Sequence, residues 1–134
     1  MLVYSRINHK VGSSEADLLY TNSMSTTAVG REAESRVVDH LIRQGFRLIG
    51  QNWRTRWCEI DIVMQKKQTV YFIEVKHRTS DRWGDGLDYI TPHKLRQMRF
   101  AAELWLAEHD WDGDAQLAAV GVSPTLVGQL VELE

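Results

Sequence analysis

The fold of this chain is most constrained by two apolar segments, CEIDIVM at residues 58–64 and TVYFIEVKH at residues 69–77. Both have the composition of β-strands, and only the polar stretch QKKQ separates them. Two strands joined by so short a polar connection are predicted to pair as an antiparallel hairpin.

Two charged residues, Glu74 and Lys76, interrupt the second segment, and their spacing puts both side chains on one face of the strand. Alternation places Val70 and Phe72 on that same face, which is therefore at least partly covered. A charged group in such a place is unfavourable unless it is paired or binds a metal. We therefore expect Glu74 and Lys76 to have partners.

The first segment carries two further acidic residues, Glu59 and Asp61, which alternation places on one face of the strand. If Lys66 and Lys67 form a two-residue turn, Asp61 is predicted to lie opposite Phe72 and diagonal to Glu74. That diagonal spans about 7 to 8 Å at the backbone, a gap that two carboxylates can close around a cation. Oxygen ligands suit Mg²⁺ or Mn²⁺ rather than Zn²⁺, because no set of His and Cys residues has zinc-like spacing.

An amphipathic helix is predicted over residues 29–44, VGREAESRVVDHLIRQ, whose apolar residues have the spacing of one helix face. Gly45 supplies a natural stop. Glu34 falls in the middle of the apolar arc, so its carboxylate is aimed at whatever the helix packs on. The alternative is a position at the edge of that face, or a pairing with a nearby arginine.

The remaining elements complete one mixed α/β domain. Residues 46–49 are predicted to be a short strand, NWRTRW a basic, aromatic connector and residues 79–90 a loop. Thr91 and Pro92 are typical of the N-cap and first position of a second helix. Further strands are expected near LAAVGV and LVGQLVELE. We expect residues 1–26 to be a loosely ordered extension and residues 27–134 a single domain.

The charges are distributed unevenly along the chain. All 16 Lys and Arg residues precede Phe100, together with 11 acidic residues, for a net charge of +5, whereas 7 acidic residues and no Lys or Arg follow it. This asymmetry can mean a basic working surface beside an acidic end segment, or simply solvated charge. No apolar run could span a membrane and the start lacks the apolar core of a secretion signal, so a cytoplasmic location is expected.

Basic and aromatic residues alternate around the two predicted strands, in an arrangement that can neutralise phosphates and stack on unpaired bases. The alternative is ordinary surface charge and core tryptophan. We expect Arg78 to make the first phosphate contact, with Lys94 and Arg54 as further contacts. The single cysteine, Cys58, is interpreted as a small packing residue rather than a nucleophile.

Asp61, followed after twelve residues by Glu74-Val75-Lys76, resembles the Asp…Glu-x-Lys signature of the PD-(D/E)XK nuclease superfamily, with Ile60 where proline is usual. A wider pattern, GREAE, HLIRQGFRLIGQNWR, CEIDIV, FIEVKHR and ITPHKLRQM, resembles the YraN-like family of uncharacterised bacterial proteins. That match runs over residues 29–106. The family's Arg-Phe-Asp signature for the last strand is not found in DAQLAAVGV.

The resemblance implies a fold similar to Holliday-junction resolvases and restriction endonucleases, a central mixed sheet flanked by helices in the order αβββαβ. It also implies that Asp61, Glu74 and the Val75 carbonyl would bind Mg²⁺ or Mn²⁺, and that Glu34 would complete the acidic site. Lys76 would position or activate the attacking water and stabilise charge on the phosphate.

The expected function is a metal-dependent phosphodiesterase that acts on DNA, including branched or single-stranded forms. A homodimer would suit branched DNA, which presents two equivalent strands to a two-fold assembly. Two alternatives remain open: a nucleic-acid-binding module of the same fold that does not cut, and a protein-interaction adaptor in which the acidic residues and Lys76 form only a buried ion network.

Overall fold

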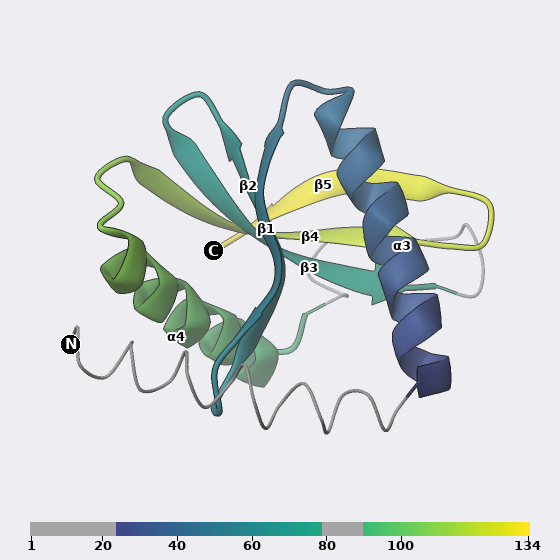
Figure 1. The fold of residues 1–134 in the computed structure, drawn as a ribbon, viewed down its shortest axis with the longest axis horizontal. Helices are drawn as coiled ribbons and strands as arrows, with labels where there is room; N and C mark the ends of the chain where they lie inside the picture. The colour runs from purple at the N-terminus through teal and green to yellow at the C-terminus, as the bar shows by residue number, and fades with distance from the viewer. Residues whose placement is uncertain (1–23, 79–89) are drawn as a thin grey trace.

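A computed structural model of the chain describes residues 24–78 and 90–134, which form a mixed α/β domain (Figure 1). The elements follow in the order α3 (Met24–Ile42), β1 (Arg47–Arg54), β2 (Glu59–Lys66), β3 (Thr69–His77), α4 (Pro92–His109), β4 (Asp114–Val122) and β5 (Val127–Leu133). The strands form one sheet in sequence order, in which β3 and β4 are parallel and the other neighbours antiparallel. The predicted fold class, a mixed sheet with flanking helices, is confirmed.

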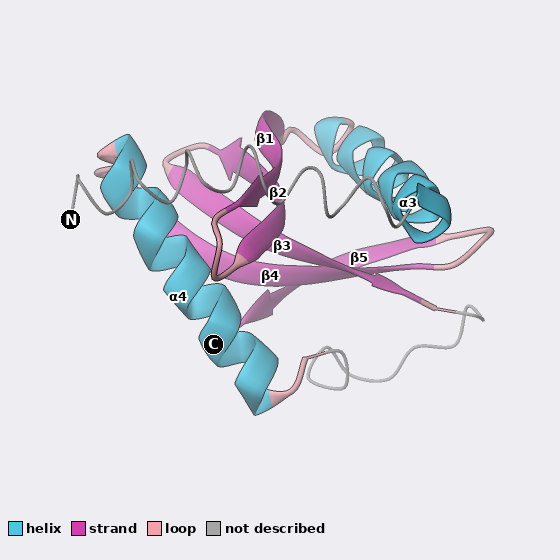
Figure 2. Ribbon diagram, turned by 60° about the horizontal axis from the view of Figure 1, so that its bottom comes forward, coloured by secondary structure: helices cyan, strands magenta, loops and turns pink. Residues whose placement is uncertain are grey.

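The two helices cover opposite faces of the sheet (Figure 2). Val37 and Leu41 of α3 pack in one apolar cluster with Ile73, whereas Trp105 of α4 packs in the other cluster with Phe72. The rings of Phe72 and Trp105 meet edge to face, with centroids 5.4 Å apart. Because side chains alternate along β3, this strand contributes to both clusters and is buried from both sides.

Several predicted boundaries need correction. The first helix begins at Met24 and ends at Ile42, so the last three residues of the predicted extension, 24–26, belong to the helix. Gly45 has a φ of +93°, as a glycine just after a helix end allows. The first strand is twice as long as predicted, and its last three residues, 52–54, belong to the predicted connector. Its regular alternation is broken by a register shift between Leu48 and Gly50, which hid the strand pattern.

The predicted hairpin of β2 and β3 is confirmed, but its predicted register is wrong by two residues. Lys66 pairs with Thr69, and the left-handed residue of the turn is Lys67, with a φ of +55°. Phe72 therefore pairs with Val63 and not with Asp61. Continued by one step beyond the last ladder pair, this register puts Asp61 directly opposite Glu74, closer than the predicted diagonal.

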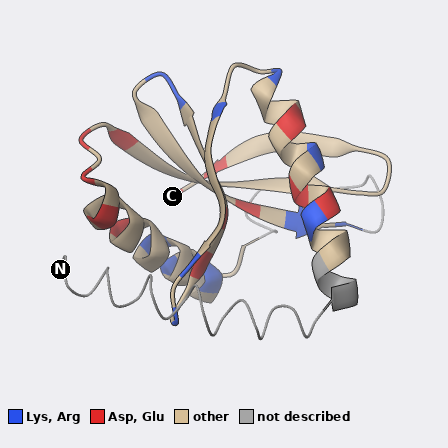
Figure 3. Ribbon diagram, in the orientation of Figure 1, with Lys and Arg blue, Asp and Glu red and all other residues tan. Residues whose placement is uncertain are grey.

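The second half of the domain agrees with the sequence. Thr91 is the N-cap of α4, Pro92 lies in its first turn, and both C-terminal strands are present. Basic residues occupy the first half of α4 and acidic residues the second, as Figure 3 shows. The predicted loop lies almost entirely outside the described residues, as do residues 1–23 of the predicted extension.

Candidate functional site

The site begins where β2 and β3 stop pairing. Their ladder ends at Ile62 and Ile73, and the next bond is made by a side chain, as the Val75 N–H donates to Asp61 Oδ2 at 2.9 Å. Ile60 and Ile62 belong to opposite apolar clusters although only one residue separates them, so the regular alternation of β2 is broken at Asp61. A strand residue directs its N–H and C=O to the same side, so the Val75 carbonyl faces this opening too.

The Asp61 carboxyl is half-buried and lies among other acids. Burial, followed by the charge of Glu74, raises its pKa to about 8, although the Val75 N–H opposes the shift. Glu34 and Glu59 raise the pKa further. Since Glu34 comes from α3 and Glu74 lies on the face that α4 covers, acidic groups from both sides of the sheet act on Asp61.

Two lysines converge on one oxygen of Glu74, whose side chain is only 13% exposed. Lys94 Nζ lies 3.4 Å from Glu74 Oε2, and Lys76 Nζ lies 3.9 Å from the same atom. The partners expected for Glu74 and Lys76 are therefore present. Lys94, predicted from sequence only as a phosphate contact, proves to be part of this group. We call it the acidic cluster, and it comprises Glu34, Glu59, Asp61, Glu74, Lys76 and Lys94.

Glu34 is buried on the inner face of α3, as its position on the helical wheel predicts, and is 6% exposed. Burial raises its pKa, while a side-chain hydrogen bond with Asn52 acts in the opposite direction. Its Oε1 atom is buried and has no hydrogen-bond partner within the described part of the chain. Glu34 therefore offers an oxygen that can still accept a hydrogen bond or bind a cation.

Asn52 is a component of the site that sequence reasoning missed. It lies in β1 with a φ of +52°, and the register of β1 and β2 puts it opposite Asp61. Asparagine tolerates this left-handed conformation better than most residues. The sequence gives little sign of this role. Asparagine is a poor strand former, and here it stands beside Trp53 within a strand.

We predict that Asn52→Ala lowers the free energy of unfolding by about 2 kcal/mol, because alanine strains the left-handed backbone and leaves Glu34 without its amide donor. Asn52→Gly loses the same hydrogen bond but relieves the backbone, so it should cost only about 1 kcal/mol. Urea denaturation at neutral pH measures both. Equal stability of the two variants would mean that the backbone conformation of residue 52 carries no cost.

The donor set fits a hard divalent cation. Within residues 24–78 and 90–134, no group of three His, Cys, Asp or Glu side chains is arranged as a ready metal site. Two carboxylates, those of Asp61 and Glu74, and the Val75 carbonyl are nevertheless the hard oxygen donors that Mg²⁺ accepts, and Mg²⁺ commonly uses one or two carboxylates and completes its shell with water or phosphate. The buried, unsatisfied Oε1 of Glu34 agrees with a cation or water in this place.

The other predicted phosphate contacts lie apart from one another. The Arg78 N–H donates to the Val122 carbonyl at 2.8 Å, and its side chain lines a pocket of about 530 Å³ between α3 and the β4–β5 turn. Arg36 lines the same pocket, and its Nη1 donates to the Ser123 carbonyl at 2.7 Å. Arg54 ends β1, where it pairs with Glu59 in the ladder. The structure thus brings Lys94 to the acidic cluster, places Arg78 just beyond it, and leaves Arg54 on a different strand.

Cys58 packs as predicted. It is partly buried against the apolar cluster under α4, and its Sγ lies 3.4 Å from Thr55 Oγ1. Burial raises the pKa of the thiol, so little of the nucleophilic thiolate is present at neutral pH.

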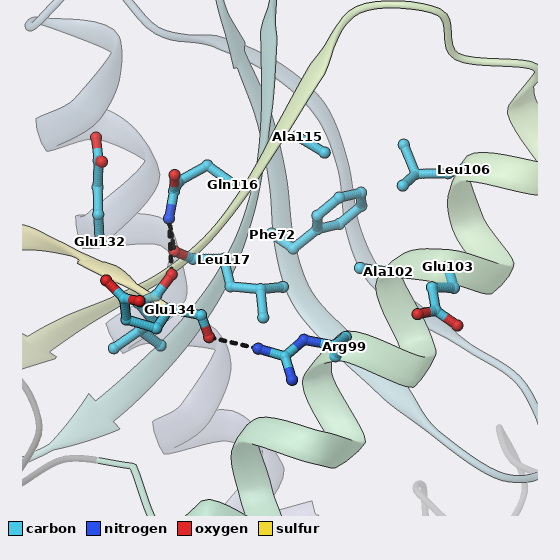
Figure 4. A pocket seen from close by; sticks show the side chains of 11 residues that line it. Phe72, Arg99, Ala102, Glu103, Leu106, Ala115, Gln116, Leu117, Glu132 and Glu134 are labelled. Carbon is cyan, nitrogen blue, oxygen red and sulfur yellow. Dashed lines mark hydrogen bonds between the residues drawn. The ribbon is translucent and has the colours of Figure 1, made fainter.

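A pocket of about 500 Å³ lies between α4 and the C-terminal strands, away from the acidic cluster (Figure 4). Arg99 crosses this pocket and donates to the Glu134 main-chain oxygen at 2.6 Å, and Gln116 donates to the Leu133 carbonyl at 2.8 Å. Both polar side chains therefore fix the end of β5 to the domain.

Neither described helix combines the length and apolar character needed to cross a lipid bilayer.

Comparison with known proteins gives a consistent family. The chain is 38% identical over 103 residues to a UPF0102 protein of Methylococcus capsulatus, which covers 77% of this chain and 84% of the relative. It is 42% identical over 90 residues to a UPF0102 protein of Mycobacterium avium, covering 66% and 70%. It is 35% identical over 118 residues to one of Parasynechococcus marenigrum, covering 85% and 87%.

The model of this family matches residues 33–122, a range that holds every carboxylate and lysine of the acidic cluster and stops before β5. The YraN-like resemblance of the sequence motifs is to this same family, so that prediction is confirmed. The chain belongs to the uncharacterised protein family UPF0102.

Proposed function

We propose that this protein is a phosphodiesterase that cleaves DNA with the help of Mg²⁺ or Mn²⁺. The observation that carries the proposal is the opening between β2 and β3, where a half-buried Asp61 lies against the Val75 N–H and beside Glu74. Placing like charges in a partly buried opening is costly unless a cation compensates them. A fold that keeps this arrangement therefore favours a function that uses a cation there.

Each group has a role in such a reaction. Asp61, Glu74 and the Val75 carbonyl would hold the divalent ion, which when bound counters charge on the phosphate and lowers the pKa of water. The Val75 N–H fixes the orientation of the Asp61 carboxyl. Glu34 Oε1, which has no hydrogen-bond partner among the described residues, would accept a hydrogen bond from the attacking water. The ammonium of Lys76 would stabilise the charge that develops on the phosphate.

Branched or single-stranded DNA is the substrate class that the nearby surface favours. Trp57, in the β1–β2 turn that leads into the site, is 48% exposed and lies under the guanidinium of Arg56 at 5.3 Å. Exposed aromatic rings beside arginine stack on bases that are not paired in a duplex. Arg54 and Arg78 would contact phosphates on either side. The proposal also places the protein in the cytoplasm, where the DNA of its bacterial relatives lies.

One observation favours a second candidate function, a nucleic-acid-binding module that does not cut. Glu74 already has two ammonium groups beside it, so its charge is compensated without a metal. This module would bind DNA in a salt-dependent manner, would keep binding after Asp61→Ala, and would form no metal-dependent product. A protein-interaction adaptor would bind neither DNA nor a divalent ion.

The test is cleavage of end-labelled duplex, four-way-branched and single-stranded DNA by the purified protein with Mg²⁺, Mn²⁺ or EDTA. The wild type should cleave at least one substrate only with a metal, and Glu74→Gln should lower the rate by about 1,000-fold or more. Glu132→Gln, an exposed glutamate on β5, is the matched control and should cut normally. No cleavage by the wild type on any of these substrates, or equal rates for the wild type and Glu74→Gln, would overturn the proposal.

A further inference from the structure

A lysine at position 94, in the first turn of α4, is unfavourable for the stability of the helix. With Thr91 as N-cap, Lys94 is the third residue of the helix, and its N–H donates to Thr91 Oγ1 at 3.1 Å. The first turn of a helix favours acidic side chains, because the unpaired N–H groups there carry positive charge. The first turn of α4 has no acidic residue at all. Helix stability therefore does not explain a lysine here.

The contacts of Lys94 supply a different explanation. Its ammonium lies 3.4 Å from Glu74 Oε2, nearer than the ammonium of Lys76 at 3.9 Å. Lys76 comes from the same strand as Glu74, whereas Lys94 reaches the carboxylate from a helix that packs on the sheet. The Lys94 side chain is 29% exposed, so it retains a route to solvent. A cation that touches a carboxylate and can swing out is suited to be exchanged for another cation.

We propose that Lys94 is a built-in competitor for a divalent cation at Glu74, and that it turns to a phosphate of the nucleic acid once it leaves that carboxylate. The first half of this inference rests on the proposed metal site, and the second half rests also on the proposed action on nucleic acid. Competition follows from charge and geometry, since an ammonium 3.4 Å from Glu74 Oε2 repels a divalent cation that binds the same oxygen at the 2.0–2.1 Å that Mg²⁺ requires.

The exchange would make metal and nucleic acid bind more tightly together than either does alone. A phosphate that attracts the Lys94 ammonium removes the competitor from Glu74, and a cation at Glu74 releases the ammonium for the phosphate. Coupling of this kind is reciprocal by necessity. Lys94 would thus limit metal binding in the free protein and favour it when a phosphodiester is present.

The test measures binding of Mn²⁺ alone, by electron paramagnetic resonance of the free ion, to the wild type and its variants at low ionic strength. Lys94→Met should tighten the Kd for Mn²⁺ by about 3- to 10-fold, because the competing ammonium is removed. Lys94→Arg keeps a cation and should resemble the wild type more closely than Lys94→Met does. Arg96→Met, an exposed position on the same helix, controls for the general loss of one positive charge and should change the Kd by less than about 2-fold.

An unchanged or weaker Mn²⁺ affinity in Lys94→Met would overturn the inference, as would an equal gain in Arg96→Met. Glu74→Gln identifies the site, since it should abolish the binding that Lys94→Met strengthens. If Lys94→Met misfolds by circular dichroism, Lys94→Gln gives the same readout with a polar side chain. Tighter Mn²⁺ binding without any DNA cleavage would refute the proposed function and keep the competition, whereas cleavage with an unaltered Kd would do the reverse.

Discussion

Replacing Asp61 with asparagine is expected to abolish DNA cleavage and at the same time to stabilise the metal-free protein at alkaline pH. The loss of activity should reach about 1,000-fold or more, because asparagine cannot supply the negative charge that holds a divalent ion. The gain in stability has a separate origin, namely the relief of repulsion within a half-buried cluster of acids. Opposite effects on activity and stability are expected of a residue whose charge serves the function at the expense of the fold.

The direction of the pH dependence follows from the pKa of Asp61. The folded protein raises that pKa from an ordinary value of 3.8 to about 8, so between these two values the folded state binds more protons than the unfolded state. The stability of the wild type should therefore fall as the pH rises from about 4 to about 8. Asparagine does not titrate, and its side-chain oxygen can still accept the Val75 N–H. Asp61→Asn should thus resemble the wild type near pH 4 and exceed it by about 2 to 4 kcal/mol at pH 8.5.

Urea denaturation in EDTA at pH 4.5, 6.5 and 8.5 measures this difference. Asp112→Asn, in the exposed turn between α4 and β4, is the control and should leave the pH dependence of the wild type unchanged. Addition of Mg²⁺ at pH 8.5 should stabilise the wild type by mass action but not Asp61→Asn. If Asp61→Asn is instead less stable than the wild type at pH 8.5, the Asp61 carboxylate is held by favourable contacts and the cation site is wrong.

The parts of the site that the sequence could predict are those that depend on local periodicity. Glu34 could be assigned to the buried face of its helix because its neighbours repeat every three to four residues, and its exposure of 6% confirms this. Glu74 and Lys76 could be placed on one face of a strand because alternation is exact over a short distance. Thr91 and Pro92 could be recognised as a helix start because the chemistry of a cap is local.

The parts that the sequence could not predict depend on backbone conformation or on distance in three dimensions. The register of the hairpin depends on where its turn lies, and the turn has Lys67 in the left-handed conformation. The sequence does not show which lysine of the Lys66-Lys67 pair adopts that conformation. Asn52 was assigned to a connector because a left-handed residue inside a strand breaks the pattern by which strands are found. The contact of Lys94 with Glu74 joins α4 to β3, and the two residues are far apart in the sequence, so no local pattern could reveal it.

The last prediction concerns Lys76, for which we expect a large loss of cleavage with no loss of the fold. Lys76→Met should lower kcat for DNA cleavage by about 100- to 1,000-fold, because the ammonium would no longer stabilise charge on the phosphate. The side chain is 33% exposed and Lys94 lies nearer to Glu74, so the variant should stay folded and Glu74 should keep a cationic partner.

Steady-state kinetics with the DNA substrate that the wild type cleaves best would measure this loss, with Lys67→Met in the exposed β2–β3 turn as the matched control. Lys76→Arg should recover part of the rate, since arginine restores the charge but not the compact shape of an ammonium. If Lys76 has only a structural role, both Lys76 variants should have a lower free energy of unfolding and a kcat near that of the wild type. The roles of the two lysines at Glu74 can be distinguished by experiment. Loss of Lys76 should reduce the rate of the chemical step, whereas loss of Lys94 should tighten the binding of the metal.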